Sequence, residues 1–374
     1  MNPFIIYDYA GPEYFCTRET ELKQISIALE NHRNIAIHAI AGMGKTSLIK
    51  HALQEMINAR TYWPVYADIT ETHDFDDLIN ALGTAILARA DHMPADARII
   101  TESFISRAKP RISYDPLSGK ASYTFYLDRP GEAEWTFREL LAILEVISRD
   151  VDVVVAIDEF PSIMEYPERK LADALPGMIS SLENVKYIFS GSKQRLFNSI
   201  FSNTSLAFYK NTELLALHEI PVSPYRKFIS QWIKELNLSF TPDVIPAIFN
   251  WTKRRTCFTQ YVCHKIVDNR ERFLDREGLE KVFHQILQEK EPHYLAYRKM
   301  LTSHQWRLLV ALAIEDGTGR VTTGAFLNIY NLNSSSAVLR GIDALLGKDL
   351  IYRSKGAYFV HDVFFAHWLR WKQG

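Results

Sequence analysis

The fold is decided by residues 34–47, Asn34-Ile35-Ala36-Ile37-His38-Ala39-Ile40-Ala41-Gly42-Met43-Gly44-Lys45-Thr46-Ser47. Their first part is apolar and predicts a strand over Asn34–His38, and the residues after Thr46 have the apolar spacing of an amphipathic helix. Gly42 and Gly44 lie between the two, and glycine lets the backbone turn tightly and approach a ligand closely. The stretch therefore predicts a strand, a loop and a helix in immediate succession.

A loop between a strand and a helix can bind phosphate, because its backbone N–H groups point inward and the helix N-terminus carries partial positive charge. Lys45 is expected to reach the β- and γ-phosphates of ATP, and the Thr46 hydroxyl is expected to ligate Mg²⁺. Ala39 stands where the usual pattern has its first glycine. The residues predicted to bind the nucleotide here are Ala39, Gly42, Met43, Gly44, Lys45, Thr46 and Ser47. The alternative is a glycine turn that opens an ordinary helix.

A second apolar run, Val153–Ile157, ends in two carboxylates, Asp158 and Glu159. The carboxyl ends of parallel strands form the edge at which such sheets bind ligands. Asp158 is predicted to bind the Mg²⁺, and Glu159 is predicted to orient and deprotonate the water that attacks the γ-phosphate. The alternative is an acidic pair that ends a strand in a solvated turn.

The next predicted strand also ends in polar residues, Ser190-Gly191-Ser192. A hydroxyl group at this strand end can lie beside the γ-phosphate. Ser192 is the preferred candidate for such a polar sensor and is grouped with Glu159 and Lys45 as catalytic, and Ser190 is the alternative.

From about Tyr14 to Ile200, apolar runs alternate with amphipathic helical stretches. This pattern predicts an α/β domain with a mostly parallel sheet covered by helices. The predicted strands are Asn34–His38, Tyr62–Ile69, Val151–Ile157 and Val185–Ser190. Alternating segments on both sides of a turn at 115–119 predict an inserted β-hairpin over about 108–128. Leu214–Ile220, followed by prolines, marks the exit from the sheet, so the domain is expected to span 1–222.

The remaining sequence predicts two smaller domains, a helical lid over 223–300 and a winged helix over 301–374. The winged helix is expected to contain helices at His304–Glu315 and Thr323–Tyr330 and a third helix opened by Ser334-Ser335-Ser336. Two short strands around a Lys355-Gly356 turn would form its wing. No internal repeat at a fixed period is evident.

The composition is that of an ordinary globular protein, with 47% hydrophobic and 23% charged residues among 374. The 43 Lys and Arg residues nearly balance the 44 Asp and Glu residues, so no global positive field favours nucleic acid or anionic lipid. No membrane partner is expected, and the N-terminus lacks a secretory signal, which indicates a cytoplasmic location. The cysteines, Cys16, Cys257 and Cys263, are expected to be buried thiols without a zinc or disulfide role.

Taken together, these motifs resemble the AAA+-like branch of P-loop ATPases, and within it the archaeal-type ATPases allied to the STAND switch ATPases. The segment from Tyr14 to Leu22 is similar to the entry motif of that group, which implies that Arg18 lies near the adenine. Val360-His361-Asp362 resembles the motif by which STAND proteins sense bound ADP with a C-terminal domain. The resemblance therefore implies that His361 contacts the nucleotide, whereas the alternative is that His361 and Asp362 cap the following helix.

The resemblance implies an ATP-hydrolysing molecular switch with ATP or ADP and Mg²⁺ as its cofactors. A homo-oligomer is possible, in which Arg169, Arg195 or another arginine would act in trans. A protein partner of unknown identity is also expected, and the hairpin over 111–126 is a candidate contact for it.

The alternative is a nucleotide-gated DNA-binding regulator that uses the winged helix. The helix after Ser335 offers Arg340 and then Lys348, which is little positive charge for anchoring phosphates. The basic run Lys253-Arg254-Arg255 is interpreted as a solvated face, a nucleotide contact or a DNA patch.

Overall fold

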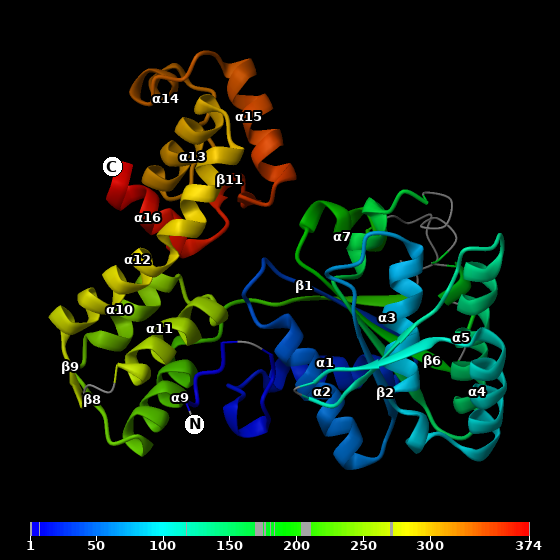
Figure 1. Cartoon of the computed structure of the whole chain (residues 1–374). Helices are drawn as coiled ribbons and strands as arrows, with labels where there is room; N and C mark the ends of the chain where they lie inside the picture. Colours follow the sequence, from blue (N-terminus) through cyan, green and yellow to red (C-terminus); the bar gives the residue numbers. More distant parts are fainter. Residues whose placement is uncertain are drawn as a thin grey trace. The chain divides into compact units, whose positions relative to one another are not determined.

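The computed structural model describes residues 2–6, 8–116, 118–168, 175, 177–179, 181–182, 184–202, 211–269 and 272–373 (Figure 1). The chain divides into two compact units. The first comprises residues 8–218, and the second combines residues 1–7 with residues 219–374. The predicted domain limits at 222 and 300 stay predictions.

A parallel sheet forms the centre of the first unit (Figure 1). Among the described residues its strands follow the order β2 (Trp63–Asp68), β5 (Val153–Asp158), β6 (Val185–Gly191), β1 (Asn34–His38) and β7 (Thr212–Ala216). The predicted parallel α/β fold is therefore confirmed, and the predicted strand ends differ from the observed ones by two residues at most. β7 was missed, because the interpretation of this region as an exit from the sheet overlooked an edge strand that pairs with β1.

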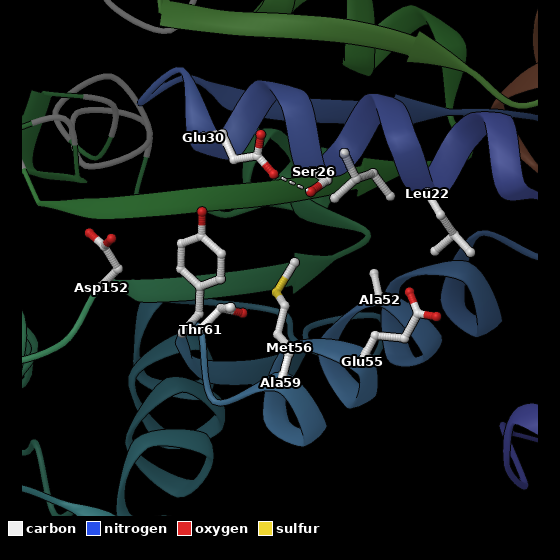
Figure 2. A pocket seen from close by; sticks show the side chains of 11 residues that line it. Leu22, Ser26, Glu30, Ala52, Glu55, Met56, Ala59, Thr61 and Asp152 are labelled. Carbon is white, nitrogen blue, oxygen red and sulfur yellow. Dashed lines mark hydrogen bonds between the residues drawn. The ribbon is translucent and has the colours of Figure 1, made fainter.

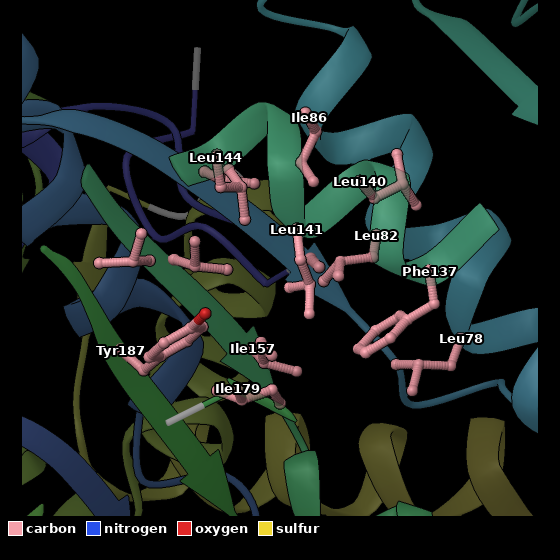
Figure 3. Packing of buried hydrophobic residues seen from close by; sticks show 14 of the residues in the cluster. Leu78, Leu82, Ile86, Phe137, Leu140, Leu141, Leu144, Ile157, Ile179 and Tyr187 are labelled. Carbon is pink, nitrogen blue, oxygen red and sulfur yellow. The ribbon is translucent and has the colours of Figure 1, made fainter. Parts of the chain in front are cut away.

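The sheet separates two hydrophobic clusters, because alternate residues of each strand point to opposite faces. In β5, Val153, Val155 and Ile157 join one cluster, and Val154 and Ala156 join the other. Figure 3 shows the first cluster, in which helix side chains such as Leu82 and Leu141 lie above the strands. The helices of this cluster include α3 (Phe75–Leu87), α4 (Ala95–Ala108) and α5 (Glu132–Ile147), and those of the other include α1 (Glu19–Glu30) and α2 (Lys45–Ala59).

The predicted hairpin is present as β3 (Arg111–Tyr114) and β4 (Ala121–Thr124), which pair in antiparallel fashion. It is attached to α3 by side chains. The Thr84 hydroxyl accepts a hydrogen bond from the backbone N–H of Tyr123 at 2.9 Å, and the side-chain amide oxygen of Asn80 accepts one from the N–H of Phe125 at 2.8 Å. Short helices complete the unit: η1 (Pro12–Tyr14), η2 (Ala90–His92), η3 (Phe160–Glu165) and α7 (Gln194–Phe201).

The second unit begins with helices that cover the predicted lid. They are α9 (Val222–Glu235), α10 (Val244–Thr252), α11 (Thr256–Asp268) and α12 (Arg276–Met300), with a small parallel pair β8 (Ser239–Phe240) and β9 (Phe273–Leu274). The N-terminal residues are part of this unit. Phe4 is completely buried, its carbonyl oxygen lies 2.7 Å from Nδ1 of His264, and the Asn2 amide donates to the carbonyl oxygen of His264 at 3.0 Å.

The last part of the second unit contains the elements predicted for the winged helix. They are α13 (Ser303–Glu315), α14 (Gly324–Ile329), α15 (Ser335–Gly347), β10 (Ile351–Ser354), β11 (Ala357–Val360) and α16 (Val363–Gln373). Thr302 and Gln305 form a capping box at the start of α13, and the Ser334 side chain caps α15. Lys355 and Gly356 both have positive φ, as a tight two-residue hairpin turn requires.

Two further sequence expectations can be compared with the structure. Cys16 and Cys263 are buried, but Cys257 is exposed, so the expectation of a buried thiol was wrong for Cys257. Within the part of the chain that the structure describes, no helix is long and apolar enough to cross a membrane.

Candidate functional site

The loop between β1 and α2 has the backbone conformation that its glycines predict. Gly42 and Gly44 have φ values of 83° and 91°, in the left-handed region that favours glycine. Gly44 occupies the N-cap of α2 and has no side chain with which to cap it. The first N–H groups of a helix of this kind are available to an anion that binds at its N-terminus.

Lys45 is the first residue of α2 and is almost completely buried. Its Nζ atom donates to the carbonyl oxygen of Ala39 at 3.2 Å and lies 3.4 Å from Oε1 of Glu159. Lys45 therefore connects the first residue of the loop to the acidic end of β5. The lysine and the glutamate that the sequence assigned to catalysis lie side by side.

Asp158 is buried at the end of β5 and accepts hydrogen bonds at both of its carboxylate oxygens. Oδ2 accepts from the Thr46 hydroxyl at 2.6 Å and from the Tyr66 hydroxyl at 2.9 Å. Oδ1 accepts from the Ser190 hydroxyl and from the backbone N–H of Glu159 at 3.2 Å. The carboxylate is thus fixed by donors from the first turn of α2, from two neighbouring strands and from its own strand end.

Glu159 is fixed by a different serine. Its Oε2 accepts from both the backbone N–H and the hydroxyl of Ser192, each at 2.8 Å. The backbone of Glu159 has a φ of 55°, a left-handed value that is uncommon outside glycine and that occurs frequently at functional sites. Ser190 therefore contacts the predicted metal carboxylate and Ser192 contacts the predicted catalytic carboxylate, and their roles stay predictions.

Thr46 and Asp158 offer the oxygen ligands that Mg²⁺ prefers, and the hydrogen bond between them, 2.6 Å long, shows that these oxygens are neighbours. Over the described residues there is no group of three or more His, Cys, Asp and Glu side chains that could hold a metal. Mg²⁺ usually keeps several waters and binds substrate phosphates with only one or two protein ligands. The chemistry of this pair is therefore suited to Mg²⁺ that arrives with a nucleotide.

Arg18 supports the loop from behind. It is buried, and its guanidinium donates to Glu21 at 2.8 Å, to the carbonyl oxygen of His218 at 2.7 Å and to the carbonyl oxygen of Met43 at 3.1 Å. These acceptors connect α1, the end of the first unit and the loop. The predicted proximity of Arg18 to the adenine stays a prediction, and its visible contacts are those of a residue that holds the loop in place.

Sequence analysis missed an aromatic cluster next to the loop. The rings of Phe15 and His51 are stacked with centroids 4.0 Å apart, and the Tyr9 hydroxyl lies 2.8 Å from Nδ1 of His51. Burial lowers the pKa of His51, which favours its neutral form. Phe15 belongs to the segment that resembles the entry motif, so its aromatic character could have indicated a cluster here. The stacking of Phe15 on His51 of α2 could not be predicted from either residue alone.

His361 lies in the second unit, between β11 and α16. Its backbone N–H donates to the carbonyl oxygen of Leu350 at 2.8 Å, and its own carbonyl oxygen accepts from the Arg255 guanidinium. Asp362 accepts from the backbone N–H of Phe365 at 3.0 Å, which is the capping contact that the alternative interpretation expected of the pair. The sensing role of His361 stays a prediction.

The basic run after α10 is not a uniform solvated face. Arg255 is buried, and its guanidinium lies 4.9 Å from the ring centroid of Phe258. Lys253 forms an ion pair with Asp316 and lies 5.4 Å from the ring centroid of Phe359. Two of the three cations are therefore engaged within their own unit, which weakens the interpretation of the run as a DNA patch.

Arg169 and Arg195 are the two arginines named as candidates for a catalytic role in a neighbouring subunit. Arg169 lies outside the described residues. Arg195 is exposed on α7, the helix that follows β6, and β6 contains Ser190 and ends just before Ser192. Its role stays a prediction.

A pocket of about 350 Å³ lies at the opposite edge of the sheet (Figure 2). Its lining comes from α1, from α2 and from the segments that precede β2 and β5, including Tyr62 and Asp152. Asp158 ends the same strand that Asp152 precedes, so this pocket and the carboxylate pair lie at opposite ends of β5. The pocket is therefore separate from the loop between β1 and α2.

The comparisons with known proteins agree with this architecture. Residues 292–371 match a family model described as a probable winged helix domain. The comparison with curated proteins gave no match. Among solved structures, a Walker-type ATPase of Pyrococcus abyssi is similar with a TM-score of 0.69 and 17% identity, over 98% of this chain and 99% of that chain.

A second similar structure is the ORC2 protein of Aeropyrum pernix in ADPNP–ADP complexes, with a TM-score of 0.52 and 12% identity over 99% of this chain and 98% of that one. At these identities the similarity establishes the fold. The chain therefore has an α/β fold with a five-stranded parallel sheet, a helical region and a C-terminal winged helix, an architecture that it shares with the Walker-type ATPase of Pyrococcus abyssi.

Proposed function

We propose that the chain binds ATP with Mg²⁺, hydrolyses it slowly to ADP and phosphate, and uses the nucleotide state as a molecular switch of the AAA+/STAND type. The observation that carries the proposal is the convergence of Lys45, Thr46, Asp158, Glu159 and Ser192 at one edge of the sheet. These residues come from three separate segments of the sequence. A structural role alone does not require an ammonium group, a hydroxyl group and two carboxylates to meet beside a glycine loop.

In the proposed reaction, the loop and the N-terminus of α2 bind the phosphates, and Lys45 neutralises charge on the β- and γ-groups. Thr46 and Asp158 hold Mg²⁺, which when bound neutralises charge that develops on the phosphate oxygens. Glu159 accepts a proton from the attacking water. The oxygen of that water forms a bond to the γ-phosphorus while the bond from this phosphorus to the bridging oxygen breaks, and ADP leaves.

The Lys45–Glu159 contact bears on how the base would be activated. The charged atoms of the two side chains are 3.4 Å apart. A bound γ-phosphate would compete for the Lys45 ammonium, because phosphate oxygens are strong acceptors for it. Glu159 would then keep its two bonds to Ser192 and become free to bind a water molecule, so nucleotide binding itself would activate the base.

The switch part of the proposal rests on the second unit. His361 is held by Arg255 on one side and precedes the capped helix α16 on the other, so a contact between His361 and ADP would act on the whole winged helix. We propose a protein partner, a cytoplasmic location and possible self-assembly in the ATP-bound state. DNA is the alternative partner, but α15 carries one cation, Arg340, and Lys348 follows its end.

The test compares purified wild type with Lys45→Ala, Glu159→Gln and His361→Ala variants, and with Glu145→Gln as a control on the exposed side of α5. Turnover of Mg-ATP and the identity of the co-purifying nucleotide are measured with and without DNA. We expect Glu159→Gln to bind ATP without turnover, Lys45→Ala to lose binding and Glu145→Gln to match wild type. Nucleotide binding without any turnover in wild type, together with tight DNA binding, would favour the DNA-regulator alternative.

A further inference from the structure

Asp158, the candidate Mg²⁺ ligand, accepts one hydrogen bond from a residue that belongs to none of the sequence motifs. Tyr66 lies on β2, and its hydroxyl donates to Oδ2 of Asp158 at 2.9 Å. In the sheet register Tyr66 is opposite Ala156, and Asp68 is opposite Asp158. The long tyrosine side chain therefore spans two residues along the strands to reach the carboxylate.

The side chain of Tyr66 is held at its ring as well as at its hydroxyl. The Lys50 ammonium lies 4.6 Å from the ring centroid, and Lys50 also forms an ion pair with Asp8. Lys50 follows Thr46 by four residues in α2, so both residues lie on the same face of the helix. The ring of Tyr66 is therefore fixed by the same helix that supplies the predicted Mg²⁺ ligand.

The hydroxyl of Tyr66 remains a donor. A carboxylate oxygen only accepts, so the phenol O–H of Tyr66 is the donor in this contact. The Asp158 carboxylate also accepts from Thr46, Ser190 and the Glu159 N–H. Of these donors, Tyr66 alone lies outside the segments that sequence analysis assigned to the site.

We propose that Tyr66 is a positioning residue that fixes the orientation of the Asp158 carboxylate and so strengthens Mg²⁺ binding with the nucleotide. This inference rests on the proposed function. Its physical basis is that the hydrogen bonds to a metal-binding carboxylate hold its oxygens in the binding orientation. Without the phenol, one oxygen of Asp158 loses a fixed donor and the carboxylate gains freedom to rotate.

The test uses Tyr66→Phe, which keeps the ring under Lys50 and removes only the hydroxyl. Tyr62→Phe is the matched control, because Tyr62 lies just before the other end of the same strand and lines the pocket of Figure 2. Binding of a fluorescent, non-hydrolysable ATP analogue is measured first in EDTA and then as a function of Mg²⁺ concentration. This readout does not depend on turnover.

In EDTA, we expect Tyr66→Phe to bind the analogue with the affinity of wild type. With Mg²⁺, the variant should need a roughly 10-fold higher Mg²⁺ concentration for the same increase in affinity, because loss of a hydrogen-bond partner of a metal ligand typically weakens metal binding by about this factor. Tyr62→Phe should follow the wild-type curve. If wild type binds the analogue with a clear Mg²⁺ dependence and Tyr66→Phe shows the same or a stronger dependence, the positioning role is wrong and the proposed function is unaffected. If wild type does not bind the analogue at all, the proposed function itself fails.

Discussion

Gly191 allows η3 and α7 to pack closely against the end of β6, and its replacement by alanine should damage both stability and catalysis. An added Cβ would lie 2.6 Å from Cγ and 2.9 Å from Cδ of Pro161, and 3.0 Å from Cδ2 of Phe197. A proline ring has little freedom to move away. Gly191 is not among the residues with positive φ, so the clash, and not backbone strain, is the expected cause of the effect.

The size of the effect follows from overpacking in a well-packed region, which typically costs about 1–3 kcal/mol. For a domain of this size, each kcal/mol lowers the melting temperature by roughly 2–4 °C, so Gly191→Ala should lower the melting temperature of the first unit by roughly 2–12 °C. The variant also lies between Ser190 and Ser192. A shift of the strand end would displace the donors that hold Asp158 and Glu159, so turnover should fall by about 10-fold or more at temperatures where the variant remains folded.

The assay combines thermal unfolding of the whole chain with Mg-ATP turnover at a temperature well below the transition. Gly347→Ala is the control, because a Cβ at that position meets no atom within 4 Å and should change neither quantity. Wild-type stability and turnover for Gly191→Ala would refute the reasoning. Loss of stability with unchanged turnover would show that the strand end can shift without moving the serines.

Other contacts give further predictions. Phe4→Ala should destabilise the second unit by about 3–5 kcal/mol, because Phe4 is completely buried there, and chemical denaturation should show this loss without a change in the transition of the first unit. Burial lowers the pKa of His367 to about 4, so the second unit should lose stability as the pH falls from about 6.5 towards 4, and His367→Gln should flatten this dependence in urea titrations at pH 5 and pH 7. Replacement of residues 111–124 by a short glycine linker should leave basal ATP turnover intact, and loss of nucleotide binding would contradict the assignment of the hairpin as a partner contact.

The elements that the sequence predicted are those whose signals are local. The strand, loop and helix over residues 34–59 are contiguous, and the continuous apolar runs of β5 and β6 have a single interpretation as buried parallel strands. The start of α15 is likewise local, because the serines predicted to open this helix include its N-cap, Ser334. In each of these cases the physical cause of the structure lies within one segment.

The features that the sequence did not predict depend on pairings between distant segments. β7 contains Glu213 and borders the sheet on one side, so it lacks the apolar run of a central strand. The phenol of Tyr66 reaches a carboxylate 92 residues later, and Phe4 packs in a unit that otherwise begins at Glu219. Ser190 bonds to Asp158, and Ser192 bonds to Glu159. The sequence does not predict which serine bonds to which carboxylate, because the two serines have the same chemistry and only their positions at the strand end distinguish them.

The division of the chain into units bears on how its proposed activity could be regulated. Lys45, Thr46, Asp158, Glu159 and Ser192 all belong to residues 8–218, and the contacts among them are made within that unit. His361 belongs to the other unit, together with the Arg255 that holds its carbonyl oxygen.

If the proposed roles are right, the chemical step depends on the residues of the first unit and the response to ADP depends on His361 and Arg255. The two should therefore separate by mutation: Glu159→Gln should abolish turnover and preserve nucleotide exchange, and His361→Ala should change the rate of ADP release while a single-turnover measurement of hydrolysis stays close to wild type. A loss of single-turnover hydrolysis in His361→Ala would instead place this histidine among the residues that the chemical step requires.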